Sequence, residues 1–250
     1  MTVLIHAENL HKHFGAIRAV GGVSLRVNAG EIVGFLGPNG AGKTTTMRML
    51  TGFLDPDAGE ISMAGIALRN DPLRARAAIG YLPEGAPAYP EMTVREYLTF
   101  IARARSIPAR EIEGRLDSIA HRVHLRGVLD QVIETLSKGF KRRVGIAQAL
   151  IHDPPILIMD EPTDGLDPNQ KYEVRQLIRE MGPTKAIVLS THILEEVEAV
   201  CTRAVVIAAG VVVFDGTPAA FERLAPAGVT QHRMDSAFRA MTASAGEVAS

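Results

Sequence analysis

A glycine-rich stretch, GPNGAGKTT at residues 37–45, constrains the fold of this 250-residue chain more than any other part of the sequence. It matches the pattern G-x-x-x-x-G-K-[ST], follows an apolar run of strand length at residues 31–36, and precedes a segment of helical composition at residues 43–50. Small residues let backbone N–H groups turn inward around a polyphosphate, and the helix dipole adds partial positive charge there. We therefore predict an α/β fold that binds a nucleoside triphosphate, rather than a glycine-rich turn without a ligand.

The phosphate loop (residues 37–45) contains two side chains with defined chemistry. Lys43 is expected to reach the β- and γ-phosphates, and the Thr44 hydroxyl to bind Mg²⁺, a hard cation that prefers oxygen ligands. Nucleotide contacts are predicted for the whole loop, that is for Gly37, Pro38, Asn39, Gly40, Ala41, Gly42, Lys43, Thr44 and Thr45.

Two carboxylates follow a second apolar run at residues 156–159, which is continuous enough for a central parallel strand buried on both faces. Asp160 lies at the carboxyl end of that strand, where it is expected to hold Mg²⁺ from the side opposite Thr44. Glu161 follows, and is expected to take a proton from, or orient, a water that attacks the γ-phosphate. The alternative is that Asp160, Glu161 and Pro162 merely cap the strand.

The composition excludes several classes of protein. The 27 basic and 28 acidic side chains nearly cancel, so the sequence offers no electrostatic field for nucleic acid or an anionic membrane, and no nucleic-acid partner is expected. Cys201 is the only cysteine, which excludes an internal disulfide and a cysteine-rich metal site. Apolar stretches such as residues 204–214 fall far short of the roughly 18 residues of a spanning helix. A membrane role is therefore expected to depend on a partner.

The order of predicted elements indicates one large domain over residues 1–224, with a helical insertion at about residues 85–150, and a short tail at residues 225–250. Strands at residues 3–9 and 19–27 predict an antiparallel layer before the phosphate loop. The later alternation of strands and helices predicts a mainly parallel core sheet. The tail is rich in alanine and glycine, with one helix expected around residues 234–241.

The segment LSKGF at residues 136–140, with the helix that follows it, resembles the LSGGQ signature of ABC-type ATPases. The other motifs of that family stand in family order around it, with ILIMDEP at residues 156–162, GLD at 165–167 and STH at 190–192. The resemblance runs from about Leu4 to Pro218 and implies a P-loop NTPase of the ABC-ATPase fold that binds ATP and Mg²⁺. It further implies a head-to-tail homodimer or pseudo-dimer, in which one subunit closes over the nucleotide of the other through Ser137, Lys138, Gly139 and Asp167.

The same resemblance assigns an aromatic and a histidine. Phe14 takes the position of the aromatic that stacks on adenine, since stacking needs only a π-face; the alternative is ordinary core packing. His192 is implied to contact the γ-phosphate, because a histidine donates a hydrogen bond in either charge state. The other seven histidines are expected at the surface or at caps.

Three positions depart from the family pattern. Glu84 stands where the family usually has glutamine; its carboxylate is able to bind Mg²⁺ directly or through water, and it adds negative charge near the γ-phosphate. Lys138 replaces the first signature glycine and Phe140 the signature glutamine. The changes resemble ATPase subunits of bacterial exporters whose membrane subunits are separate chains, of the gliding-motility, copper-processing and multidrug types.

The leading hypothesis is an ATP-hydrolysing motor subunit of an ABC exporter, with Lys43, Glu84, Glu161 and His192 as its catalytic set. Its expected partners are a second ATPase subunit, identical or a paralogue, and integral membrane permease subunits at the cytoplasmic face of the inner or plasma membrane. One alternative is a soluble ABC ATPase acting on DNA or ribosomes, although no tandem cassette, coiled coil or basic extension is visible. The other is a nucleotide-dependent regulator with weak hydrolysis, which Glu84 and the altered signature favour.

Overall fold

A six-stranded core sheet runs through the centre of the computed structural model, which describes residues 2–247. Its strand order is β10-β9-β3-β8-β7-β6, and every neighbouring pair is parallel except β10 with β9. Every residue of β3, β7 and β8 is buried, which explains why these strands are apolar up to the polar residues at the carboxyl ends of β7 and β8. The strands are β3 (Ile32–Leu36), β6 (Ile79–Leu82), β7 (Ile156–Asp160), β8 (Ala186–Thr191), β9 (Arg203–Ala208) and β10 (Val211–Gly216). The mainly parallel core sheet is therefore confirmed.

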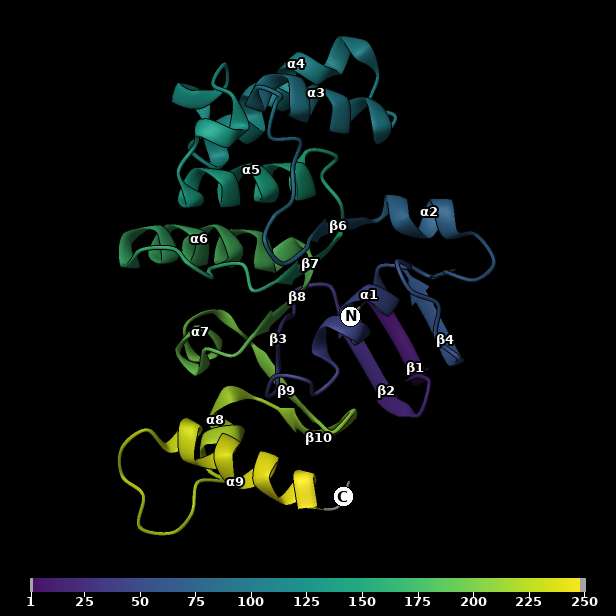
Figure 1. Ribbon diagram of the computed structural model, residues 1–250, viewed down its shortest axis with the longest axis vertical. Helices are drawn as coiled ribbons and strands as arrows, with labels where there is room; N and C mark the ends of the chain where they lie inside the picture. The colour runs from purple at the N-terminus through teal and green to yellow at the C-terminus, as the bar shows by residue number, and fades with distance from the viewer. Residues whose placement is uncertain (1, 248–250) are drawn as a thin grey trace.

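A separate antiparallel sheet has the order β2-β1-β4-β5 and lies beside the core sheet in Figure 1. Its strands are β1 (Val3–Phe14), β2 (Ile17–Asn28), β4 (Ala58–Met63) and β5 (Ile66–Ala67). β1 does not end at Asn9 as predicted, because a bulge there lets the strand continue to Phe14. The pairing of β1 with β2 shifts between Ala7 and Leu10, and Asn9, at φ +51°, donates its N–H to Ser24 Oγ instead.

Helices inserted between β6 and β7 form one end of the molecule (Figure 1). These are α3 (Val94–Ala104), α4 (Ala109–Arg122), the 3₁₀ turns η1 (Arg126–Val128) and η2 (Ile133–Thr135), and α5 (Lys138–Leu150). α3 begins with a capping box, in which Thr93 Oγ1 accepts from the Glu96 N–H and the Glu96 carboxylate accepts from the Thr93 N–H. This arrangement confirms the helical insertion of the predicted fold.

Two apolar cores lie on opposite faces of the core sheet. Leu157 and Met159 of β7 pack toward α5 and α6 (Pro168–Met181), while Ile156 and Ile158 pack toward α1 (Lys43–Leu50) and the antiparallel sheet. The alternation of side chains along β7 therefore joins the helical insertion to one face and the phosphate loop to the other. The elements that complete these layers are α2 (Pro72–Ala77), η3 (Gly182–Thr184) and α7 (Leu194–Val200).

The C-terminal helices α8 (Pro218–Glu222) and α9 (Arg233–Glu247) lie at the end opposite the insertion (Figure 1). Phe221, Met234 and Ala237 are buried there with Leu36 and Val206 of the core sheet. The helix expected around residues 234–241 is present and longer than predicted, and it packs against the sheet. Residues 248–250 of the predicted tail lie outside the described part. Within residues 2–247, none of the helices combines the length and the apolar character that crossing a bilayer requires.

Candidate functional site

The phosphate loop connects β3 to α1, and its geometry depends on glycine. Gly42 has φ +103°, and a Cβ at this position would lie 2.5 Å from the Ala19 carbonyl oxygen; at Gly37 a Cβ would lie 2.4 Å from the Ile207 carbonyl oxygen. No side chain caps the start of α1. The first N–H groups of the helix therefore face the loop and are available to an anion.

Lys43 is folded into this loop. Its Nζ donates to the Gly37 carbonyl at 2.6 Å and to the Pro38 carbonyl at 3.1 Å. Burial lowers the pKa of Lys43, and the nearby Glu161 and Asp160 carboxylates act in the opposite direction. The ammonium is held by carbonyl oxygens that a phosphate oxygen would replace as a stronger partner.

Asp160 ends β7 with an incompletely satisfied carboxylate. Its Oδ1 accepts from the hydroxyl of Ser190, the residue opposite it on β8, whereas Oδ2 is buried without a hydrogen-bond partner among the described residues. A buried carboxylate oxygen in this state suits a hard cation. Within residues 2–247, no group of three or more His, Cys, Asp or Glu side chains forms a metal cluster by itself. A magnesium ion here therefore fits as one shared with phosphate oxygens of a nucleotide.

Glu161 turns the chain sharply after β7. Its φ is +48°, its N–H donates to the Ser190 carbonyl at 3.1 Å, and its own carbonyl accepts from the Asp164 N–H at 3.1 Å. A left-handed backbone is costly for a residue with a side chain, and such strain concentrates at functional sites. His192 follows β8, and its Nδ1 lies 3.0 Å from each of the two Glu161 carboxylate oxygens.

One cavity of about 200 Å³, here called the phosphate cavity, brings these groups together. It joins the phosphate loop to the residues that follow β6 and β7, and His192 meets it through Glu161. Three of the four predicted catalytic residues, Lys43, Glu84 and Glu161, therefore line one cavity. The lining residues are Ala19, Asn39, Gly40, Gly42, Lys43, Thr44, Thr45, Glu84, Asp160 and Glu161.

The remaining predicted contacts do not line the phosphate cavity. Phe14 ends β1 with 51% of its surface exposed, and Lys12 Nζ lies 5.9 Å from the centre of its ring. It is therefore not part of the buried core. An exposed π-face beside a cation is compatible with a stacked ring, which stays a prediction.

The signature segment (residues 136–140) lies against the loop before α6. Ser137 caps α5 by accepting from the Phe140 N–H at 3.4 Å, and Asp167 caps α6 by accepting from the Gln170 N–H at 3.0 Å. Lys138 Nζ lies 3.4 Å from Asp164 Oδ2. A Cβ at Gly139 would lie 2.4 Å from the Gln170 side chain. These residues cluster with one another, apart from the lining of the phosphate cavity.

Glu196 is a residue of this region that the sequence analysis missed. Its buried carboxylate on α7 accepts from the Thr163 hydroxyl and, at 2.7 Å, from the Thr191 hydroxyl. Burial raises the pKa of Glu196. Through its two hydrogen bonds, Glu196 links the segment after Glu161 to the segment before His192. The one available signal was helical spacing, because Glu196 precedes Val200 by four residues on the buried face of α7.

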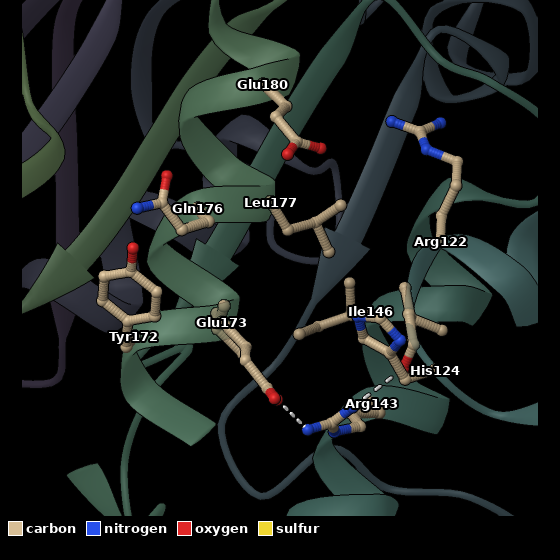
Figure 2. Close-up of a pocket in the computed structure, with 11 residues that line it drawn as sticks. Arg122, His124, Arg143, Ile146, Tyr172, Glu173, Gln176, Leu177 and Glu180 are labelled. Atoms are coloured by element: carbon tan, nitrogen blue, oxygen red, sulfur yellow. Dashed lines mark hydrogen bonds and ion pairs between the residues drawn. The ribbon is translucent and has the colours of Figure 1, made fainter. Parts of the chain in front are cut away.

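A second cavity, of about 160 Å³, lies between the end of α4, α5 and α6 (Figure 2). Figure 2 shows Arg143 of α5 directed at Glu173 of α6, and the two form an ion pair. Its walls carry charges of both signs, with Arg122 and Glu180 in addition to that pair. Because it lacks a glycine loop and a single sign of charge, this cavity does not have the chemistry of a phosphate site.

Comparison with known proteins agrees with this geometry. The family model described as ABC transporter matches residues 20–164. Nod factor export ATP-binding protein I of Ralstonia nicotianae is 38% identical over 218 residues, which are 87% of this chain and 68% of that protein. An uncharacterised ABC transporter ATP-binding protein of Bacillus subtilis, YxlF, is 38% identical over 213 residues, 85% of this chain and 70% of that protein.

Solved structures extend the likeness to the whole fold. An ATP-binding subunit of an ABC transporter superposes with a TM-score of 0.86 at 32% identity, covering 96% of this chain and 99% of that one. The bacterial cassette MJ0796 was solved as a dimer and in a post-hydrolysis state bound to ADP and Pi. It superposes with a TM-score of 0.79 at 25% identity, covering 86% of this chain and 99% of that one. Since the family model matches more than half of the sequence, this chain belongs to the ABC transporter family, as an ATP-binding subunit that hydrolyses ATP.

Proposed function

We propose that this chain is the motor subunit of an exporter and docks on integral membrane permease subunits at the cytoplasmic face of the inner or plasma membrane. The observation that carries the proposal is the phosphate cavity, where Lys43, Asp160 and Glu161 meet from separate elements. Export is supported by relatives that are named Nod factor export ATP-binding proteins. The near balance of charge supports a protein partner over nucleic acid.

The phosphate loop would hold the polyphosphate through its N–H groups, with Lys43 on the β- and γ-phosphates. Thr44 and Asp160 would hold Mg²⁺, and Glu84, which lines the same cavity, would contact it directly or through water. The metal would neutralise charge on the phosphate oxygens. The unpartnered Oδ2 of Asp160 supports this assignment, because a bound cation would satisfy it.

Glu161 is proposed to orient the attacking water and to accept its proton. His192 contacts Glu161 through Nδ1, so Nε2 is the ring nitrogen left to face the γ-phosphate. With His192 56% exposed and Glu161 only 15% exposed, the carboxylate is sheltered while the imidazole stands at the mouth of the site. Because the two side chains are in contact, His192 and Glu161 would change position together when the γ-phosphate leaves.

A second ATPase subunit, a copy of this chain or a paralogue, is proposed to complete the site. Its Ser137, Lys138 and Gly139 would meet the γ-phosphate, and its Asp167 would lie nearby. The exposed start of α5 supports this, because its N–H groups and helix dipole attract an anion. The cassette MJ0796, which was solved as a dimer, supports pairing of two such subunits. Phe14 would stack on the adenine.

The permease is proposed to dock on the segment at residues 84–97 and the start of α3. Tyr89 lies in this segment and Phe100 follows it further along α3; both are exposed, with ring centres 5.6 Å apart, and the centre of the Tyr97 ring lies 6.0 Å from that of Tyr89. Exposed aromatic side chains favour contact with an apolar partner. Because Glu84 begins this segment and lines the phosphate cavity, movement at the nucleotide would reach the docking surface.

ATP turnover with Mg²⁺ tests the proposal on the wild type, Lys43→Ala and Glu161→Gln, with size-exclusion chromatography in ATP. We expect Glu161→Gln to lower turnover by about 10²-fold or more, the usual contribution of a general base, and to accumulate as an ATP-bound dimer. Lys43→Ala is expected to lose ATP binding. Glu195→Gln, at an exposed position on α7, is the matched control and should keep wild-type turnover. Turnover of Glu161→Gln at the wild-type rate would remove its assigned role.

A further inference from the structure

Arg142 reaches from α5 into the catalytic segment of the same chain. It lies one turn into α5, after the signature segment, and is only 5% exposed. Its Nη2 donates to the carbonyl oxygen of Glu161. A side chain of the signature helix therefore holds the backbone of the proposed catalytic base.

The environment of Arg142 is not that of an ordinary structural arginine. Its guanidinium donates to a backbone carbonyl rather than to a carboxylate, and its Nη1 is buried without a hydrogen-bond partner among residues 2–247. Asp164, Asp160, Glu161 and Glu84 surround it at longer range. Burying a guanidinium is costly, and packing alone would be served as well by an apolar side chain. Its charge and its donors therefore have a use at this place.

Glu161 is a residue that needs such support. Its backbone lies in the left-handed region, and its carbonyl accepts from the Asp164 N–H as well as from Arg142. A strained conformation of this kind persists only where the surrounding contacts determine it. Without the charged donor, the Glu161 carbonyl would keep only the Asp164 N–H, and the Glu161 carboxylate would be held less firmly toward His192 and the phosphate cavity.

The same helix contacts the other side of the phosphate cavity. A Cβ at Gly145 would lie 2.7 Å from Leu82 Cδ1 and 2.7 Å from Ala86 Cβ, so α5 packs tightly on the segment that carries Glu84. Ser137, the residue proposed to meet the nucleotide of a second subunit, caps the start of α5. One rigid helix thus contacts both carboxylate-bearing segments of its own chain.

We infer that Arg142 is a positioning residue for Glu161: by holding the Glu161 carbonyl, it aims the carboxylate and links the signature helix to the hydrolytic site of the same chain. The inference rests on the proposed role of Glu161 as the base. It predicts a loss in the chemical step with little loss in ATP binding, because Arg142 does not line the phosphate cavity.

The test compares kcat and KM for ATP of the full chain with those of Arg142→Met and Arg142→Lys. We expect Arg142→Met to lower kcat by roughly 10- to 100-fold, the cost of a misplaced catalytic group, with KM within about threefold. Arg142→Lys should recover part of kcat, since its ammonium also donates to a carbonyl. Lys141→Met is the matched control: it removes a neighbouring cation of α5 that donates to the Glu134 carbonyl at 2.9 Å, and should keep kcat within about threefold.

A double-mutant cycle with Glu161→Gln separates positioning from general damage. If Arg142 acts through Glu161, adding Arg142→Met to Glu161→Gln should lower single-turnover rates by less than about threefold. An equal loss on both backgrounds, or a kcat of Arg142→Met within threefold of wild type, overturns the inference. Turnover of Glu161→Gln at the wild-type rate overturns the role of Glu161 itself and the inference with it. If thermal unfolding shows that Arg142→Met folds poorly, the test passes to Arg142→Lys. A lower kcat with little change in KM would then support the inference, and an unchanged kcat would overturn it.

Discussion

His152 illustrates how far a single residue's chemistry depends on its surroundings. Its Nε2 lies 3.1 Å from the Ile79 carbonyl oxygen of β6, and its Nδ1 is buried with no partner in the described chain. Burial is the main cause, and the nearby Arg105 cation the next, of a lowered pKa of about 4 for His152. The prediction that every histidine other than His192 lies at the surface or at a cap is therefore wrong for His152.

This depressed pKa predicts an acid-sensitive contribution to stability. Between pH 6.5 and about 4 the unfolded chain protonates His152 while the folded chain does not, so stability falls as the pH falls through this window. The loss is about 1–2 kcal/mol after allowance for solvent screening. Urea unfolding at pH 7 and pH 5 measures this loss. The free energy of unfolding should decrease less between these pH values for His152→Gln, which keeps a donor for the Ile79 carbonyl, than for wild type. His121→Gln, at an exposed site on α4, should behave as wild type; equal pH dependence in all three chains would contradict the prediction.

The site residues divide into those that a local pattern reveals and those that only the fold reveals. Lys43, Asp160 and Glu161 were predictable because the loop, the buried strand and its carboxyl end are each encoded within a few neighbouring residues. Arg142 and Glu196 were not, because a charged side chain on a helix normally faces solvent, and the segments that bury these two are distant in sequence. Charged residues buried by tertiary contacts leave little trace in the sequence.

At the scale of elements, α9 makes a testable contribution to the core. Met234 is 3% exposed and packs with Phe221 and Ala237 against the β9 side of the sheet. We expect Met234→Ala to lower the free energy of unfolding by about 2–4 kcal/mol, as for a buried methionine that leaves a cavity, measured by urea denaturation. Arg239→Ala removes only an exposed i,i+4 pair with Asp235 and should change stability by less than about 0.5 kcal/mol. Similar small effects for both would mean that α9 does not stabilise the domain.

Element boundaries were predicted closely where the sequence carries a strong local signal. β7 is one continuous apolar run, and the start of α1 is given by the phosphate-loop motif, so the structure bounds both close to their predicted residues. α2 was missed, because six residues are too few to show helical periodicity, although Asp71 and Pro72 provide a start signal. β1 was predicted too short, because the bulge at Asn9 interrupts its alternation without ending its pairing.

At the scale of the whole molecule, the phosphate cavity and the exposed signature segment are proposed to be halves of two different ATP sites. Only a second chain arranged head to tail would bring Ser137 to the phosphate loop, so the arrangement is open to chemical cross-linking. The native cysteine does not interfere with such a test. Cys201 Sγ packs where a Cβ on Gly34 would lie 3.0 Å away, and burial raises the pKa of Cys201 to about 12, so little reactive thiolate exists at neutral pH.

Two chains with one added cysteine each, Asn39→Cys and Ser137→Cys, both also carrying Glu161→Gln and the native Cys201, test this arrangement directly. Both positions are exposed, one on the phosphate loop and one at the start of α5. In a head-to-tail pair, position 39 of one chain faces position 137 of the other, whereas equivalent positions lie apart at opposite ends of the interface. A short bis-maleimide should therefore yield a cross-linked dimer from the mixture in ATP, and little from either chain alone or from the mixture without nucleotide. Cross-linking of each chain with itself, as strong as in the mixture, would instead mean that equivalent positions of the two chains face each other. It would exclude the shared ATP site, because the Ser137 of one chain would then meet the Ser137 of the other and neither would reach a phosphate loop.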